Sequence, residues 1–457
     1  MIFSNNFSKY IINKDTEGNF QDLSMKFFIT LLIISVFPRI PFLFMGFGEG
    51  DAWLVANSAL RLGKDFTYIP SRNPGFPIFE ALMTIIVPLG WFYSNLFVLI
   101  SFYLLLFVLY KICKFYNISS PKLFCSIYAF IPSSIIYSTE TMDYFLAILF
   151  FSTSWYYVKR ESFITSGIFL GLAIGTRLTT GIFSLFFVLL VFTNKSIKTK
   201  QKVYRVSKIA TVSFIIAAIC YTPAVYLYGL KVFSNPGAEY VYRNFDIVFV
   251  MQNFLTNSML FTSILSWIGF IIFGFSAIKQ KRFKKSENME LLFYIFLNFL
   301  LFSIFPFKAA YLLPMVIPVM FLGRLNLSNK AFFLIALLII SGNFVDFHVR
   351  DLRITNSDTV ESYENRSFYM EMTSTVINYQ FPANSIVVVG FYIAGIQHEL
   401  LKGYPDTWEE NVSIYYVLSQ QDVSNLNETS IYYLSQIIEF NLRITNVYLP
   451  DYGISID

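Results

Sequence analysis

The chain has little charge for its length. Asp, Glu, Lys and Arg make up only 14% of its 457 residues, whereas soluble domains carry about 25%. Hydrophobic residues make up 55% of the chain, and its mean hydropathy is +0.56. A bilayer span needs about 20 mostly apolar residues, and many segments reach that length. The composition therefore excludes an ordinary soluble protein and predicts an α-helical polytopic membrane protein.

Cysteine and histidine are also scarce, with three and two residues. All three cysteines precede residue 347, so no disulfide is predicted to stabilise the tail, residues 347–457. His348 and His398 stand alone, form no metal-binding motif and are expected on the surface. No short cleavable signal stands at the start, and polar residues 1–23 are expected in the cytoplasm.

Charge is divided unevenly along the chain. Residues 347–457 hold 5 Lys or Arg and 14 Asp or Glu, a net charge of −9, which leaves +14 for the rest. A basic membrane part followed by an acidic tail is not the pattern of a nucleic-acid-binding protein, so no nucleic-acid partner is expected. Basic residues near membrane spans more often mark the cytoplasmic side.

Apolar runs predict eleven spans in a chain of three regions. We expect a cytoplasmic segment over 1–23, a transmembrane domain over 24–346 and a small extracytoplasmic α/β domain over 347–457. The spans are predicted at about 24–45, 94–113, 120–137, 144–158, two within 162–193, 206–228, 255–278, 289–306, 309–322 and 331–346.

The stretch 76–92 decides the topology. It is apolar but contains Glu80, Pro88 and Gly90, so we expect a re-entrant or interfacial segment instead of a span. With the N-terminus inside, the inside loops then hold 20 Lys or Arg and the outside loops 7. This asymmetry follows the positive-inside rule and would be inverted if 76–92 crossed the membrane. The chain is therefore expected in the plasma or inner membrane with its tail outside.

The tail shows no catalytic signature. A β-branched run predicts a strand over 385–392, and a second strand is predicted at 444–449. Apolar residues at helical spacing predict a helix over 428–440.

Two of the predicted outside loops carry pairs of carboxylates. Glu49 and Asp51 stand between glycines directly after the first span, where a ligand or metal can approach closely. Asp51 is equally compatible with capping a helix that follows it. Glu140 and Asp143 are three residues apart and would share one face of a helix, with a solvated helix start as the alternative.

Two further loops supply basic residues. Arg177 lies between long apolar runs and needs an anionic partner, either a lipid phosphate or a carboxylate of the bundle. Lys308 is a second base at the same surface, with snorkelling from a helix end as the alternative. Arg72 lies where the first loop re-enters, and Glu80 lies within the apolar stretch, where an unpaired acid would be costly.

Acids and bases on one face of the membrane suit a reaction between an anionic lipid-linked substrate and a hydroxyl or amine acceptor. A carboxylate would take the proton of the acceptor. Arg or Lys would hold the phosphate and stabilise the charge that develops on the leaving group.

The order of these motifs resembles that of the GT-C fold integral-membrane glycosyltransferases, which include protein O-mannosyltransferases, aminoarabinose transferases and dolichyl-phosphate-mannose-dependent relatives. Glu49-Gly-Asp51 is similar to the modified DxD motif that follows the first span of the family. Residues 139–143 fall where the second acidic loop falls, and 167–177 resemble a glycine-rich span that ends in Lys or Arg. Residues 308–314 resemble the "(R/K)-Y-LLP" span, although Ala310 stands where that motif usually has Arg. The resemblance covers about residues 20–325.

The resemblance implies an inverting transfer of a sugar from a polyprenyl-phosphate donor to a lipid, glycan or protein acceptor at the outer face. Asp51 would be the general base, with Glu49 beside it, and Asp143 and Glu140 would position the substrate or the base. The residues expected to bind substrate, above all the donor phosphate, are Arg177, Lys308, Tyr311, Arg72 and Glu80. Members of this fold differ in metal need, so the resemblance allows a divalent cation.

Two other functions fit parts of this pattern. A flippase or other transporter would place charges at mid-bilayer between related halves of the chain. The sequence shows no internal repeat, and its charges gather at one surface. An O-antigen-type polymerase or ligase would share the outer face and the lipid carrier, and only an acceptor assay separates it from a transferase.

Overall fold

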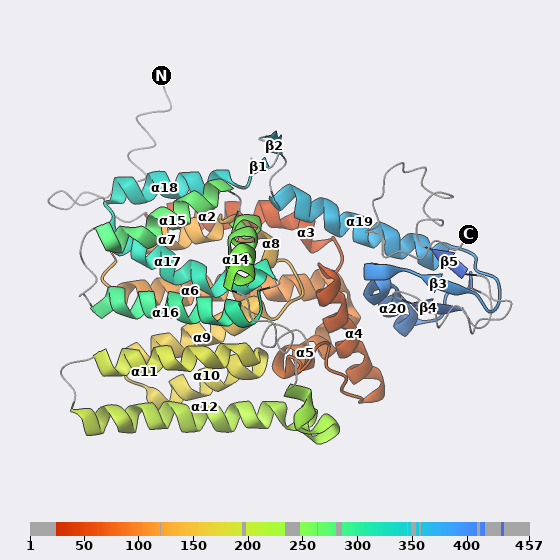
Figure 1. Ribbon diagram of the computed structural model, residues 1–457, viewed down its shortest axis with the longest axis horizontal. Coiled ribbons are helices and arrows are strands. Elements are labelled where there is room, and N and C mark those ends of the chain that lie inside the picture. The colour runs from red at the N-terminus through yellow and green to blue at the C-terminus, as the bar shows by residue number, and fades with distance from the viewer. Residues whose placement is uncertain are drawn as a thin grey trace.

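The computed structural model describes twelve stretches of the chain. They are residues 24–118, 120–193, 198–233, 247–262, 264–279, 286–306, 308–344, 346–348, 353–355, 358–408, 412–415 and 431–433. Most of these residues are helical. The long helices lie side by side with their axes in similar directions, and α4, α5, α19 and α20 gather at one end of them (Figure 1).

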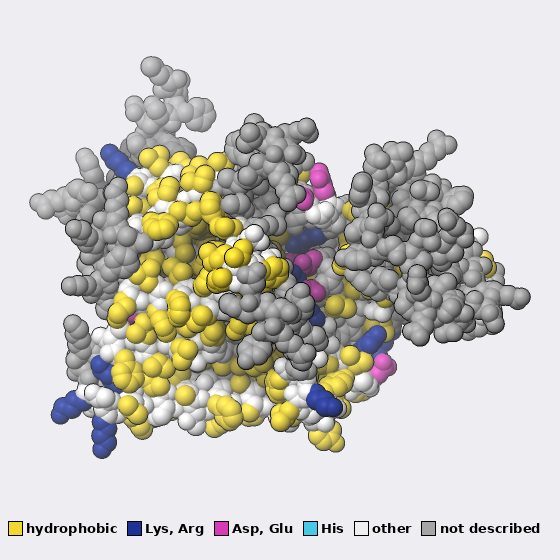
Figure 2. All heavy atoms as spheres, in the orientation of Figure 1, with side chains coloured by type: hydrophobic (Ala, Val, Ile, Leu, Met, Phe, Trp, Pro, Cys, Tyr) yellow, Lys and Arg dark blue, Asp and Glu magenta, His cyan; other side chains and the backbone are white. Residues whose placement is uncertain are grey.

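Five helices in the described stretches are long and apolar enough to cross a membrane. They cover Met25–Leu43, Trp91–Phe115, Thr199–Phe233, Glu287–Ile304 and Ala309–Asn326. Shorter apolar helices cover Pro77–Leu89, Phe163–Thr176, Leu178–Thr193, Leu265–Ser276 and Lys330–Ser341. Apolar side chains also cover much of the visible face of the bundle (Figure 2). The protein is therefore a helical membrane protein.

The helices of the bundle overlap the predicted apolar runs, but the five spans of full length in the described residues do not confirm the predicted count of eleven. The helices are α2 (Met25–Val36), η1 (Phe37–Arg39), α3 (Ile40–Leu43), α6 (Trp91–Phe115), α7 (Pro121–Ala129), α8 (Pro132–Tyr137), α9 (Tyr144–Lys159), α10 (Phe163–Thr176), η3 (Leu178–Phe183), α11 (Ser184–Thr193), α12 (Thr199–Tyr228), η4 (Gly229–Phe233), α14 (Ile247–Thr262), α15 (Ile264–Lys279), α16 (Ser286–Ile304), η5 (Ala309–Leu312), α17 (Leu313–Asn326) and α18 (Asn329–Ser341).

The predicted span 120–137 is interrupted, because Pro132 has no N–H to continue α7 and instead begins α8. The predicted span 255–278 contains parts of two helices, α14 and α15, which point in different directions (Figure 1).

The apolar stretch after the first loop is short. It forms α5 (Pro77–Ile86) and η2 (Val87–Leu89), and Gly90 then turns the chain into α6 with a positive φ of 104°. Ten α-helical residues span about 15 Å, well short of the roughly 30 Å hydrocarbon layer.

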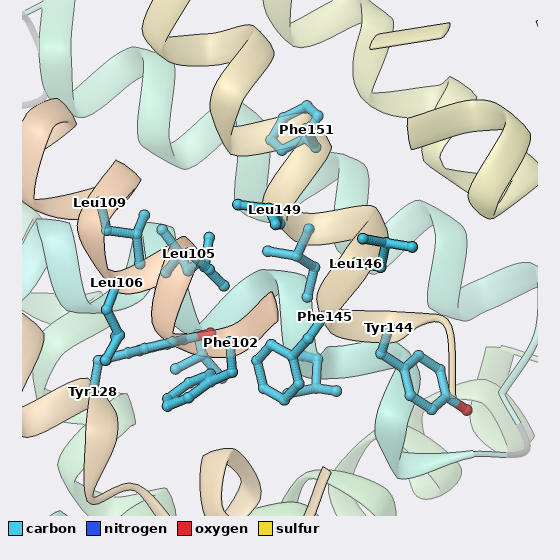
Figure 3. Close-up of a cluster of buried hydrophobic side chains, with 14 of the residues drawn as sticks. Phe102, Leu105, Leu106, Leu109, Tyr128, Tyr144, Phe145, Leu146, Leu149 and Phe151 are labelled. Carbon is cyan, nitrogen blue, oxygen red and sulfur yellow. The ribbon is translucent and has the colours of Figure 1, made fainter. Parts of the chain in front are cut away.

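Aromatic and aliphatic side chains fill the interior of the bundle. Phe102 of α6 lies between Tyr128 of α7 and Phe145 of α9, with ring centroids 5.9 Å and 4.9 Å away. Figure 3 shows this cluster, and it shows Tyr144, at the start of α9, with its hydroxyl pointing away from the other labelled side chains.

Glycines allow α10 to lie close to α12. A Cβ atom at Gly167, Gly171 or Gly175 would collide with side chains of α12. Small residues at helix contacts allow such close approach in membranes. This contact fixes the end of α10, where Arg177 follows.

The tail combines helices with two small sheets. Strands β1 (Asp346–His348) and β2 (Arg353–Thr355) pair antiparallel. Helix α19 (Asp358–Asn378) follows, then β3 (Ile386–Val388), η6 (Gly390–Tyr392), α20 (Ile393–Lys402), β4 (Ser413–Tyr415) and β5 (Ile431–Tyr433). β3 lies between β4 and β5, and both pairings are parallel.

Two predictions for the tail need correction. The strand predicted over 385–392 ends at Val388, because the chain turns at Gly390, whose φ is 54°. The helix predicted over 428–440 is wrong at 431–433, where β5 pairs with β3. The other residues of that helix, and the strand predicted at 444–449, lie outside the described residues.

The tail packs against the first loop. α4 (Gly50–Asp65) contacts α20, where the Asn57 amide donates to the Ala394 carbonyl at 2.9 Å. His398 of α20 is fully buried against Phe47 and Trp53, and its Nδ1 lies 3.0 Å from Asn57 Oδ1. Burial, together with the charge of Lys402, lowers the pKa of His398 to about 3. Its predicted surface position is therefore wrong, and the neutral ring donates from Nδ1. His348 belongs to β1, and its side chain lies outside the described part.

Candidate functional site

The first acidic pair lies at the start of α4. Glu49 precedes the helix, and Asp51 lies in its first turn, but neither side chain caps the helix by a hydrogen bond. Asp51 Oδ2 instead accepts from Arg72 Nη1 at 2.5 Å and from Lys308 Nζ. The capping alternative is therefore wrong for Asp51, which belongs to a group of ion pairs.

Lys308 connects the two acids of this pair. Its ammonium forms ion pairs with both Glu49 and Asp51, although it lies more than 250 residues away along the chain. It directly precedes η5, which contains Tyr311, and its side chain is only 19% exposed. Lys308 therefore does not extend into solvent from a helix end.

The same contact bears on a metal site. Carboxylate oxygens are ligands that divalent cations prefer, but the Lys308 ammonium occupies the space between Glu49 and Asp51. Within the described stretches, no group of three or more His, Cys, Asp or Glu side chains could hold a metal ion. The arrangement therefore does not fit a divalent cation at this pair.

The second acidic loop is buried beside the first. Glu140 Oε1 accepts from the Glu49 backbone N–H at 2.9 Å, and Glu140 is only 2% exposed. Gly48 allows this approach, because its φ is 127° and a Cβ there would collide with the Glu140 side chain. Asp143 precedes α9, is fully buried and does not cap the helix through its side chain. A solvated helix start is therefore wrong for this loop.

Arg177 finds its anionic partner in that loop. Its Nη1 donates to Asp143 Oδ1 and Oδ2 at 2.9 and 2.8 Å. The guanidinium also lies 4.5 Å from the ring centroid of Tyr144 and 5.1 Å from that of Tyr311. The ion-pair alternative for Arg177 is thus present, and two tyrosines from distant helices flank the pair.

Arg72 retains unused hydrogen-bonding capacity. Its Nε and Nη2 are buried and make no hydrogen bond to any described residue. The Tyr144 hydroxyl is likewise buried without such a partner. Buried donors left unpaired cost about 1–3 kcal/mol each, so these groups indicate a place for an acceptor-rich ligand.

Glu80 supports the loop that carries Arg72. Its carboxylate accepts from the Tyr68 hydroxyl at 2.6 Å and from the backbone N–H groups of Ser71 and Phe76 at 2.9 and 3.0 Å. Glu80 is fully buried. The structure therefore places this expected substrate-binding residue beneath the loop, where it fixes the backbone on both sides of Arg72.

One member of the site was not expected from the sequence. Arg366 of α19 donates to the carbonyl oxygens of Thr139 and Ile136 at 2.8 and 2.9 Å, and lies 3.9 Å from Glu140 Oε2. It connects the tail to the second acidic loop. Its only sequence signal is an Arg within a polar helix of an acidic tail, which is an ordinary surface pattern.

The described charge cluster is balanced. It contains four carboxylates and four cationic groups: Glu49, Asp51, Glu140 and Asp143, with Arg72, Arg177, Lys308 and Arg366. Figure 2 shows acidic and basic side chains together beside the apolar face, between α14 and the tail.

The acids of the cluster titrate differently. Burial and the nearby charge of Glu49 raise the pKa of Glu140 to about 7. Burial alone would raise the pKa of Asp51, but the charges of Lys308 and Arg72 outweigh it and hold that pKa below its ordinary value. With Glu140 protonated the cluster carries one spare positive charge.

An apolar cavity adjoins the cluster. Arg177 and Tyr311 supply polar groups to it, and the rest of its wall is largely apolar and aromatic. Its lining also includes Tyr144, Ala147, Ile148, Phe151, Thr179, Thr180, Phe183, Tyr294, Leu301, Ala310 and Pro314. Its volume is about 30 Å³, the space of about one or two water molecules, so it is an apolar pocket beside Arg177 and too small for a lipid chain.

No protein-family model, curated protein or solved structure matches this chain. The class that the fold and the site define is a helical membrane protein with a buried acid–base cluster.

Proposed function

We propose that the chain is a membrane glycosyltransferase that moves a sugar from a polyprenyl-phosphate donor to an acceptor at the extracytoplasmic face. The observation that carries the proposal is the unpaired donor capacity of Arg72 beside Lys308 and Arg177. A phosphodiester oxygen would satisfy those donors.

The charge of the cluster fits such a donor. A phosphodiester carries one negative charge, which matches the spare positive charge of a cluster with Glu140 protonated. Electrostatic matching in a site that excludes water is the largest contribution to many enzymatic rate enhancements.

The proposed reaction forms one bond and breaks one bond. The acceptor oxygen or nitrogen attacks C1 of the sugar, the C1–O bond to phosphate breaks, and polyprenyl phosphate leaves. Asp51 takes the acceptor proton. In the free protein Lys308 and Arg72 hold the Asp51 pKa low. A bound phosphate would draw these cations toward itself, which raises the pKa of Asp51 and makes it a better base.

The remaining carboxylates and Tyr311 have supporting roles in this proposal. Glu49 and Glu140 position the acceptor and Asp51, while Asp143 holds Arg177 where the phosphate would bind. Tyr311 covers Arg177 from the side of η5. The GT-C-like topology of eleven spans, with a cytoplasmic N-terminus and an extracytoplasmic tail, belongs to the same proposal. It is supported by the gathering of α4, α5, α19 and α20 at one end of the bundle (Figure 1).

The test is sugar transfer by the purified full chain in lipid vesicles, with polyprenyl-phosphate hexoses as donors and native membrane lipids as acceptors. Asp51→Asn is expected to lower transfer about 100-fold or more, as loss of a general base does, while donor binding is unchanged or tighter. Asp65→Asn, at the exposed end of the same helix, is the matched control. Full activity in a folded Asp51→Asn variant would exclude Asp51 as the base.

A further inference from the structure

A second cavity lies between the tail and the two acidic loops. Its volume is about 410 Å³, within the range of roughly 300–1,000 Å³ typical of small-molecule sites. Glu49 and Glu140 form one side, and α19 forms the other through Glu361, Ser362 and Asn365. It has no lining residue in common with the apolar cavity.

The two cavities meet at the charge cluster. Tyr137 of the second cavity and Tyr144 of the apolar cavity are in edge contact, with ring centroids 5.9 Å apart. Glu49 lines the second cavity and also forms the ion pair with Lys308. A ligand in the second cavity would therefore lie directly beside the proposed donor site.

Rigid contacts hold the wall that the tail contributes. Arg366 fixes α19 to the second loop through the Thr139 and Ile136 carbonyls. Tyr369 stacks on Trp53, with centroids 5.6 Å apart, and its hydroxyl donates to the Phe391 carbonyl at 3.1 Å. The cavity is thus built by the folded protein from both the bundle and the tail.

The lining leaves hydrogen-bonding groups for a ligand. Glu361, Ser362 and Asn365 make no side-chain hydrogen bond or ion pair within the described residues. Phe391 at the rim is 63% exposed, although burying such a ring is favourable by about 1.5–3 kcal/mol. Carboxylate and amide groups opposite an exposed aromatic face match a polyhydroxylated ring, with hydroxyls on its edges and C–H groups on its faces.

The charges select among acceptors. The carboxylates of Glu49 and Glu361 face the cavity, whereas Arg366, its one lining cation, is engaged by backbone carbonyls. An anionic ligand would meet carboxylates without a free counter-charge. We infer that this cavity is the acceptor site of the transferase and that it takes a neutral sugar, whose hydroxyl reaches the Glu49–Asp51 pair. The inference rests on the proposed function for its catalytic meaning, but the binding can be tested alone.

The experiment measures binding of neutral hexose trisaccharides, with maltotriose first, and of the anionic trigalacturonate to the full chain in nanodiscs. Phe391→Ala is expected to weaken binding of the neutral probe about tenfold, a change of about 1.4 kcal/mol, and Phe344→Ala, at an exposed ring outside the cavity, is its control. Glu361→Lys should shift preference toward trigalacturonate, whereas Glu371→Lys, elsewhere on α19, should not.

The outcomes separate this inference from the proposed function. The acceptor site is supported if both cavity variants alter binding of the neutral probe while their binding of polyprenyl phosphate stays within about twofold of the wild type. The acceptor site is overturned if the wild type does not bind neutral sugar, or if all variants bind it equally. It is also overturned if the wild type prefers trigalacturonate or a peptide. Failure of the proposed function has a different sign: the chain would not bind polyprenyl phosphate, or Arg177→Gln would leave that binding unchanged.

Discussion

Lys308 is the residue on which the proposed donor site depends most. Its ammonium joins Glu49 and Asp51, and it is one of three cations that would face the phosphate. Lys308→Met removes one positive charge from a balanced cluster and leaves Glu49 without its partner. The donor phosphate then loses one charge-assisted hydrogen bond.

The size of the effect follows from these contacts. A hydrogen bond to a charged group contributes about 1.5–3 kcal/mol, so donor binding should weaken roughly 10- to 150-fold. Breaking a fully buried ion pair costs about 3–5 kcal/mol. Here Asp51 keeps Arg72, and the Glu49 side chain is 40% exposed, so we expect a smaller loss of about 1–3 kcal/mol of unfolding free energy.

The assay is binding of labelled polyprenyl phosphate to the chain in nanodiscs, alongside thermal unfolding. Lys308→Arg keeps the charge and should restore donor binding to within about fivefold of the wild type. Lys330→Met, an exposed residue of α18, is the control. If folded Lys308→Met binds polyprenyl phosphate as tightly as the wild type, Lys308 does not bind the phosphate and the reasoning is refuted.

Three other changes probe the rest of the cluster. Glu140 has a raised pKa of about 7. The contribution of its protonated form to stability and to donor binding is therefore present at low pH and is lost as pH rises through 7. Donor affinity should fall by up to about tenfold per pH unit above that value. Glu140→Gln, which can still accept from the Glu49 N–H, should make donor affinity independent of pH, and an unchanged pH profile would assign the titration to another group. Arg366→Met removes the donors to two buried carbonyls, so the free energy of unfolding should fall by about 2–5 kcal/mol. The measurement is thermal or denaturant unfolding, with Glu371→Met as the control. A loss below about 0.5 kcal/mol would show that α19 is held by other contacts. Glu80→Gln weakens the hydrogen bonds that support the Arg72 loop, so donor binding should weaken roughly tenfold while the second cavity still binds the sugar probe. Equal loss of donor binding and sugar-probe binding would indicate general unfolding.

Much of the site can be predicted from the sequence, because an unpaired charge at membrane depth is energetically costly. Asp51, Arg72, Arg177 and Lys308 stand next to apolar runs, and such residues must pair or bind a ligand. The sequence therefore indicates that acids and bases converge. It does not indicate that Arg177 pairs with Asp143 while Lys308 joins Glu49 and Asp51, because those pairings depend on how distant helices pack.

The contributions of the tail were hidden for the same reason. Arg366 lies on a polar helix and His398 on an amphipathic one, and nothing local marks them as buried against segments more than 200 residues earlier. Ile431–Tyr433 is a short apolar run of the kind that periodicity cannot assign to helix or strand. Its pairing with β3 depends on a partner more than 40 residues away.

The fate of the C1–O bond of the donor tests the central claim most directly. The purified chain would be given a polyprenyl-phosphate hexose, labelled in the sugar, together with native membrane acceptors, and the products identified by mass spectrometry. The proposed transferase predicts free polyprenyl phosphate and a glycosylated acceptor in equal amounts, both lowered about 100-fold or more by Asp51→Asn. Intact donor moved across the bilayer would contradict the account in favour of a flippase. Transfer only of a preassembled glycan from a lipid diphosphate would contradict it in favour of a polymerase or ligase.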